Sequence, residues 1–213
     1  MPVKINHFDR GKPFYPYIIN YISTLHGIIE LISRSIIKKI EHLNGIEIEN
    51  FFREVDLRPD IKENFKKNRT TTPLIPLSLK SFFQQDRIEI NIEEIANDWF
   101  NNGHYLVSYQ MKAAGVLFIV AYETTKKYND NSPIWNFFYH CRNAAAHNGK
   151  FTFTKWGLKK LPAKWGQFEI TKSSEGTNLF RIPNSGGLLG IGDPIRLLWD
   201  IEQQYPQMRV EPS

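Results

Sequence analysis

A cation, an amide and an imidazole occur within six residues of this chain, in the segment Arg142-Asn143-Ala144-Ala145-Ala146-His147. A guanidinium can stabilise charge that accumulates on phosphate oxygens, and an imidazole can transfer protons near neutral pH. These are the groups that a ribonuclease without a metal ion needs. The residue types therefore indicate chemistry on a phosphodiester, with Arg142, Asn143 and His147 as the candidate residues.

The segment closes a predicted helix that begins after Ser132 and stops at Asn148-Gly149. At 100° per residue, Arg142, Asn143 and His147 project onto one side of this helix. The same side carries further polar and aromatic residues, of which we expect Tyr139 and His140 to contact substrate: Trp135, Asn136, Tyr139 and His140. The other side carries an apolar set that we expect to be buried: Ile134, Phe137, Phe138, Cys141, Ala144 and Ala145.

This segment resembles the Arg-x4-His motif of the HEPN superfamily, in which a polar residue customarily follows the arginine. Known HEPN ribonucleases are helical bundles that dimerise with two copies of the motif facing each other. They cut RNA without a metal ion, and many are toxins or antiviral defence effectors in bacteria. The resemblance implies a HEPN-like bundle, catalytic roles for Arg142 and His147, and a homodimer that acts on RNA. An antitoxin or other inhibitor protein would be a further partner.

The sequence leaves two functions open. The first is an endoribonuclease, and the second is a non-catalytic HEPN-like module that binds RNA, a nucleotide or a partner protein. A structural alternative for the motif is that Arg142 pairs with a carboxylate and His147 only caps its helix. One HEPN subgroup carries a tyrosine two residues after the histidine, where a nucleotidyltransferase modifies it. Gly149 stands at that position here, which argues against this form of regulation.

As a ribonuclease, the protein would use His147 to take the proton from a ribose 2′-hydroxyl, while Arg142 binds the scissile phosphate. Asn143 would orient the imidazole or contact the phosphate. In-line cleavage also needs an acid for the departing 5′-oxygen, and a two-fold dimer would supply it as the second copy of His147. The expected product is a 2′,3′-cyclic phosphate, so dimerisation would be part of catalysis.

The composition is that of a globular protein: 213 residues, of which 41% are hydrophobic, with a net charge of +5 and a pI near 9.2. This mildly basic balance suits a polyanionic partner. The single cysteine, Cys141, falls on the apolar helix side and is predicted to be a core residue. We find no signal peptide pattern at the N-terminus, no membrane span and no metal-ligand or cofactor motif, and we expect a cytoplasmic protein without a cofactor.

Apolar periodicity predicts a mainly α fold, read as a single HEPN-like domain over residues 1–213. One stripe, Ile18 to Leu43, predicts a long helix over 17–43 that ends at Asn44-Gly45. The stretch 104–127, whose central part 111–122 is apolar almost all round, predicts a buried central helix. Two further helices are predicted over 48–68, with a break at Pro59, and over 92–101, after Asn91. A final helix is predicted to begin at Asp193-Pro194 and to end at about Tyr205. Residues 70–76 are predicted to form a loop.

A β-rich insertion is predicted at about 150–185, as a small hairpin or three-stranded excursion before the last helix. Strand-like alternation occurs at 151–154, 168–171 and 179–182. Within it Lys155-Trp156-Gly157 recurs as Lys164-Trp165-Gly166. Lys155, Trp156 and Lys164 are candidate RNA contacts, since lysines bind phosphates and indoles stack on bases. The alternative is that the tryptophans pack onto the bundle and the lysines are solvated. The glycine-rich segment 186–192 is predicted to be a loop and not a phosphate-binding site.

Overall fold

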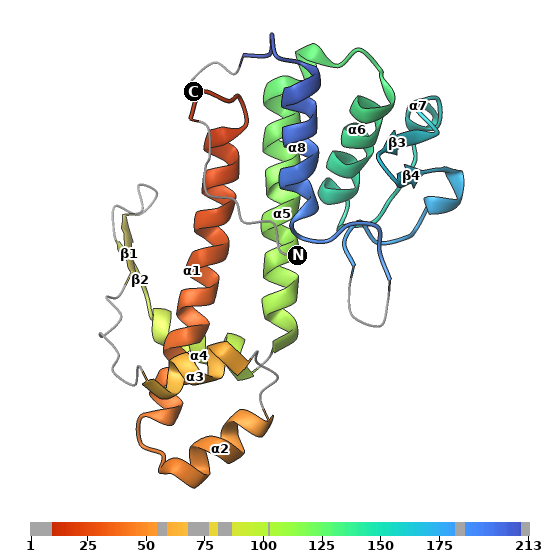
Figure 1. Cartoon of the computed structure of the whole chain (residues 1–213). Coiled ribbons are helices and arrows are strands. Elements are labelled where there is room, and N and C mark those ends of the chain that lie inside the picture. The colour runs from red at the N-terminus through yellow and green to blue at the C-terminus, as the bar shows by residue number, and fades with distance from the viewer. Residues whose placement is uncertain are drawn as a thin grey trace. The chain divides into compact units, whose positions relative to one another are not determined.

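The computed structural model describes residues 10–54, 59–67, 77–80, 87–101, 103–181 and 186–209. The protein is mainly helical and contains small antiparallel sheets, which confirms the predicted fold class at that level (Figure 1). It consists of two compact units. Unit 1 comprises Met1–Leu25 and Val107–Ser213, and unit 2 comprises His26–Leu106. The single-domain organisation stays a prediction. No helix among the described residues is both long and apolar enough to cross a membrane.

Unit 1 contains the start of α1 (Tyr15–Ile40), most of α5 (Gly103–Thr125), a 3-10 turn η1 (Lys126–Tyr128), α6 (Pro133–Ala146) and α8 (Asp193–Gln204). Helix α6 is in contact with α8 (Figure 1), and Gly115 of α5 lies against Ala145 of α6. The shared core of these helices is centred on three fully buried aromatic side chains of α6, namely Trp135, Phe137 and Phe138. Burying such large rings supplies much of the driving force that holds the motif helix in place.

The predicted boundaries of α6 are confirmed. Ser132 is the N-cap residue in an extended conformation, and Pro133 occupies the first turn, where its missing N–H costs nothing. After Ala146 the chain turns through positive φ angles at Asn148 (54°) and Gly149 (73°), and the Gly149 N–H donates to the Ala144 carbonyl at 2.9 Å. This left-handed stop fixes where the motif helix ends.

The two long helices differ from the sequence expectation in their burial. In α1, Ile29 is 52% exposed, and the buried isoleucines belong to separate cores: Ile18 to that of unit 1, and Ile36 and Ile40 to that of unit 2. The predicted apolar stripe is therefore divided between the two cores. In α5, Val116 and Val120 are exposed, so this helix is not buried all round.

Unit 2 contains α2 (Gly45–Glu54), α3 (Pro59–Lys67), β1 (Leu77–Lys80), β2 (Arg87–Ile90) and α4 (Ile92–Asn101). The predicted break at Pro59 is confirmed. Asn44 does not end α1, which stops at Ile40. Instead its Oδ1 accepts from the N–H groups of Ile46 and Glu47, both at 3.1 Å, and so caps α2. The antiparallel pair β1–β2 was not predicted, and the predicted loop at 70–76 lies outside the described residues.

The β-rich insertion contains one hairpin, β3 (Ala163–Trp165) paired with β4 (Phe168–Ile170), with Gly166 at φ 54° in the turn. A short helix α7 (Lys155–Leu158) precedes it and a 3-10 turn η2 (Lys172–Ser174) follows. The hairpin alternative is confirmed. No third strand is present in the described parts of 151–154 and 179–182. In and next to these segments there are only two isolated bridges, Lys150 to Asn178 and Phe180 to Leu189.

The last helix, α8, begins one residue earlier than an Asp cap would place it. Gly192 is the N-cap residue, and Asp193 is the first helical residue, whose Oδ2 accepts from the Gly190 N–H at 2.7 Å. The preceding glycine segment is a loop, as predicted. Gly187 is required there, because a Cβ at its φ of 138° would lie 2.2 Å from the Phe180 carbonyl oxygen.

Candidate active site

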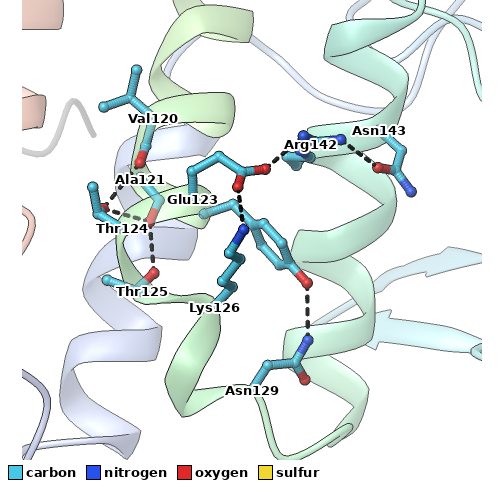
Figure 2. A network of polar contacts seen from close by, with 10 residues as sticks. Val120, Ala121, Glu123, Thr124, Thr125, Lys126, Asn129, Arg142 and Asn143 are labelled. Carbon is cyan, nitrogen blue, oxygen red and sulfur yellow. Dashed lines mark hydrogen bonds and ion pairs between the residues drawn. The ribbon is translucent and has the colours of Figure 1, made fainter.

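Arg142 lies in the last turns of α6 and is held by two neighbouring side chains, one from α6 and one from α5 (Figure 2). Its Nη1 donates to Asn143 Oδ1 at 3.0 Å, and its Nη2 donates to Glu123 Oε1 of α5 at 2.5 Å. Lys126 donates to the other carboxylate oxygen of Glu123 at 2.7 Å. The side chains of Arg142 and Glu123 are 29% and 36% exposed, so this cluster lies at the surface of unit 1.

Glu123 was not a sequence candidate, and it is the anion of this cluster. Hydrogen bonds from Lys126 and then from Arg142 lower the pKa of the Glu123 carboxyl, against the opposing effect of its partial burial. Glu123 is therefore ionised at neutral pH. Glu123 binds both Lys126 and Arg142, one through each carboxylate oxygen. It therefore orients the guanidinium of Arg142 while sharing its negative charge between two cations. The Arg142 Nε is buried and has no hydrogen-bond partner among the described residues.

His147 is the C-cap residue of α6. Its backbone N–H donates to the carbonyls of Asn143 and Ala144 at 3.0 and 3.1 Å. Its side chain is exposed, and within the described residues the imidazole makes no hydrogen bond or ion pair. The structure therefore joins Arg142 to Asn143 but does not join the His147 ring to either of them. The imidazole is left free to meet a ligand.

The predicted polar side of α6 is partly covered. Trp135 is fully buried, and its ring packs against Phe138 and Tyr205, with centroids 5.7 Å away in each case. His140 is 2% exposed and lies edge-on to Phe153 at 5.2 Å. Trp135 and His140 are therefore buried although they project onto the motif side, because the chain that follows α6 and the end of α8 fold over them.

Burial determines the chemistry of His140. Desolvation, and then the nearby charge of Lys160, lower the pKa of the imidazole to about 4, although a hydrogen bond with the Lys160 backbone acts in the opposite direction. His140 is therefore neutral at physiological pH. A substrate contact by His140 stays a prediction, and it would require this ring to become accessible.

Tyr139 remains partly accessible beside the Arg142 cluster. Its ring packs against Tyr122 of α5 with centroids 6.0 Å apart, and Lys160 Nζ lies 5.2 Å from its centroid. Tyr139 precedes Asn143 by four residues, so the two side chains lie one turn apart on the same face of α6. The side chain of Tyr139 can therefore contact a ligand that binds at Arg142.

The two Lys-Trp-Gly copies lie in different environments. Trp165 is partly buried, stacks on Phe168 at 5.5 Å and donates its Nε1–H to Asp200 at 2.7 Å, while Lys164 pairs with Glu169 at 3.2 Å. Trp156 of α7 is 62% exposed. The packing alternative therefore describes the second copy, and the first copy alone presents an open indole.

Comparison of this chain with protein-family models, with curated proteins and with solved structures finds no match. In the described parts of the chain, no group of three or more His, Cys, Asp and Glu side chains is placed to hold a metal ion. Cys141 is fully buried, and burial raises the pKa of its thiol well above the ordinary value. This confirms it as a core residue and not a nucleophile.

Proposed function

We propose that this protein is a HEPN-like, metal-independent endoribonuclease that acts as a toxin or antiviral effector in the cytoplasm. One observation carries the proposal: Arg142, fixed by Glu123 and Asn143, is followed five residues later by an exposed imidazole, His147, without a partner among the described residues. A fixed cation binds a phosphate without having to be ordered first. An unengaged imidazole is free to transfer a proton.

In the proposed reaction, His147 takes the proton from a ribose 2′-hydroxyl and the 2′-oxygen forms a bond to phosphorus. The bond from phosphorus to the 5′-oxygen breaks, and that oxygen receives a proton from the second copy of His147 in a homodimer. The products are a 2′,3′-cyclic phosphate and a 5′-hydroxyl. Arg142 stabilises the charge on the phosphate oxygens, Asn143 and Glu123 position its guanidinium, and Tyr139 contacts the RNA.

The non-catalytic HEPN-like module is the second candidate function. The pairing of Arg142 with Glu123 favours it, because a guanidinium that already has a carboxylate partner can serve to hold two helices together. In this case His147 acts only through its backbone, as the cap of α6. The same surface would then bind RNA, a nucleotide or a partner protein without turnover.

The deciding experiment is cleavage of defined RNAs in excess EDTA by the parent protein, His147→Ala and Arg142→Ala. Size and folding of all three are measured first, and the exposed His42→Ala in unit 2 serves as the matched control. We expect the two site variants to lose at least about 100-fold in rate, and the control to keep it. Product ends carrying a cyclic phosphate complete the assignment. Equal cleavage by parent and variants, or none by the parent, would leave the binding module.

A further inference from the structure

The short helix α7 carries an indole outward on a fixed support. Thr154 caps it, with its hydroxyl oxygen accepting from the Gly157 N–H at 3.1 Å. Gly157 is buried, and a Cβ there would lie 3.5 Å from Cε1 of the buried His140 on α6. The backbone of α7 is therefore packed against the motif helix. On this support Trp156 stays 62% exposed, although an indole is among the largest apolar groups a protein can bury.

Cations surround this exposed ring. The Nζ atoms of Lys159 and Lys160 lie 5.7 and 5.8 Å from the Trp156 centroid, and Lys160 also lies over Tyr139. Lys155 precedes the indole on α7 and is exposed. Within the described residues none of these three lysines has a carboxylate partner, whereas Lys164 is paired with Glu169. The positive charge around Trp156 is thus available to a ligand.

The sequence concentrates positive charge in this region. Residues 131–168 contain six lysine and arginine residues and no aspartate or glutamate, although the whole chain has a net charge of only +5. All of these residues belong to unit 1. An aromatic face flanked by cations, without neighbouring carboxylates, suits a ligand that has both a π-face and repeated negative charges. Single-stranded nucleic acid has both.

We propose that Trp156 stacks on an unpaired base of single-stranded RNA, and that Lys155 and Lys159 bind the phosphates beside that base. Lys160, placed between Trp156 and Tyr139, extends this contact toward the face of α6 that carries Asn143. This inference rests on the proposed function, because it assigns how the RNA is held next to the catalytic groups. From Tyr139 to His147 the helix rises by about 12 Å, so the stacked base lies outside the scissile step.

Duplex RNA should not use this contact. Its bases are already stacked and paired, so their faces are closed to a protein ring, whereas unpaired bases stack on aromatic side chains. If Trp156 instead served to bind a protein partner, changing it would affect the binding of single-stranded and duplex RNA equally. A loss of affinity for single-stranded RNA alone therefore indicates stacking. A purely electrostatic or purely structural role of Trp156 would change the affinity for both forms of RNA alike.

The test measures binding of a labelled single-stranded RNA of mixed sequence, and of its duplex, in EDTA and on a His147→Ala background that keeps the RNA intact. Trp156→Ala and Trp156→Phe are compared with Leu158→Ala, which removes exposed apolar surface from the same helix. We expect Trp156→Ala to weaken single-strand binding by about fivefold or more, with Phe retaining most of it and Leu158→Ala without effect. Duplex binding should be unchanged.

The lysines are tested by the dependence of affinity on salt. Lys155→Gln and Lys159→Gln should each lower the slope of log affinity against log salt by about 0.7 for single-stranded RNA. Lys172→Gln, an exposed lysine of η2, is the matched control and should leave the slope unchanged. If the slopes of Lys155→Gln and Lys159→Gln equal that of the control Lys172→Gln, the proposed phosphate contacts are overturned.

Cleavage separates this inference from the proposed function. In the catalytically intact protein, Trp156→Ala should raise KM for single-stranded RNA and leave kcat unchanged. Cleavage that depends on His147, with an unchanged KM in Trp156→Ala, would overturn the stacking contact and leave the ribonuclease standing. Trp156-dependent binding in a protein that cleaves no RNA would support the stacking contact and overturn the ribonuclease.

Discussion

The guanidinium of Arg142 on α6 lies 2.5 Å from the carboxylate of Glu123 on α5, and Glu123 also accepts from Lys126 (Figure 2). The contact joins two helices that adjoin in sequence through a short turn. It places an ionised carboxylate next to the residue proposed to bind the scissile phosphate. Glu123 can therefore act on Arg142 in two ways, by fixing its orientation or by competing with the phosphate.

Glu123→Gln separates a positioning role from a purely structural one. A pair that is about one third exposed contributes at most about 1 kcal/mol, so the free energy of unfolding should change by less than this amount. If Glu123 fixes the guanidinium, kcat for RNA should fall by about tenfold, because Arg142 loses its charged partner. Urea unfolding and steady-state cleavage measure the two quantities. Lost stability with full activity would make the pair structural only.

Arg142→Lys tests the need for a planar, forked donor. Lysine keeps the positive charge but cannot donate to Asn143 and Glu123 from one rigid plane, as Arg142 does. We expect RNA cleavage to fall by about tenfold or more while the fold is retained. Lys150→Arg, on an exposed residue after the motif, is the matched control. Equal rates for Arg142→Lys and the parent would mean that a point charge at this position suffices.

His140 makes the stability of unit 1 depend on pH. Its pKa is about 4 in the folded protein and 6.5 in the unfolded chain, so the unfolded state binds the extra proton between these values. The free energy of unfolding should fall by roughly 3 kcal/mol as the pH drops from 6.5 to 4. His140→Leu should remove this contribution. Urea unfolding of both proteins at several pH values measures it, and parallel pH curves would contradict the assignment.

The two tryptophans of the repeated Lys-Trp-Gly segments should differ in their effect on stability. Trp165→Ala removes a ring that stacks on Phe168 and a hydrogen bond to Asp200, and should cost about 2 kcal/mol or more. Trp156→Ala removes an exposed ring and should cost less than about 0.5 kcal/mol. Thermal and urea unfolding compare the two variants directly. Similar losses would show that Trp156 is also a packing residue.

Helix α6 could be predicted closely because its ends carry local signals. Pro133 starts the helix, and Asn148 and Gly149 turn the chain away with positive φ angles. Its apolar side was predicted for the same reason, since helical spacing alone determines which residues share a side. Such information extends over one or two turns and needs no knowledge of the neighbouring elements.

What the sequence could not predict depends on contacts between distant segments. Glu123 lies 19 residues before Arg142, and only the packing of α5 against α6 brings their charges together. His140 projects onto the same side as the motif, but Phe153 and Gly157 cover it after the chain has turned back. Helical rotation gives the direction of a side chain. It does not show what else occupies that direction.

Gly115 of α5 lies close against Ala145 of α6, since a Cβ on Gly115 would lie 3.4 Å from the Cβ of Ala145. Neither residue has a functional group, yet together they set how near the helix with Glu123 lies to the helix with Arg142. In a random mutagenesis screen for inactive protein, bulky substitutions at these two positions would therefore be recovered alongside those of the motif. A map of inactivating positions would extend well beyond the residues that perform the chemistry.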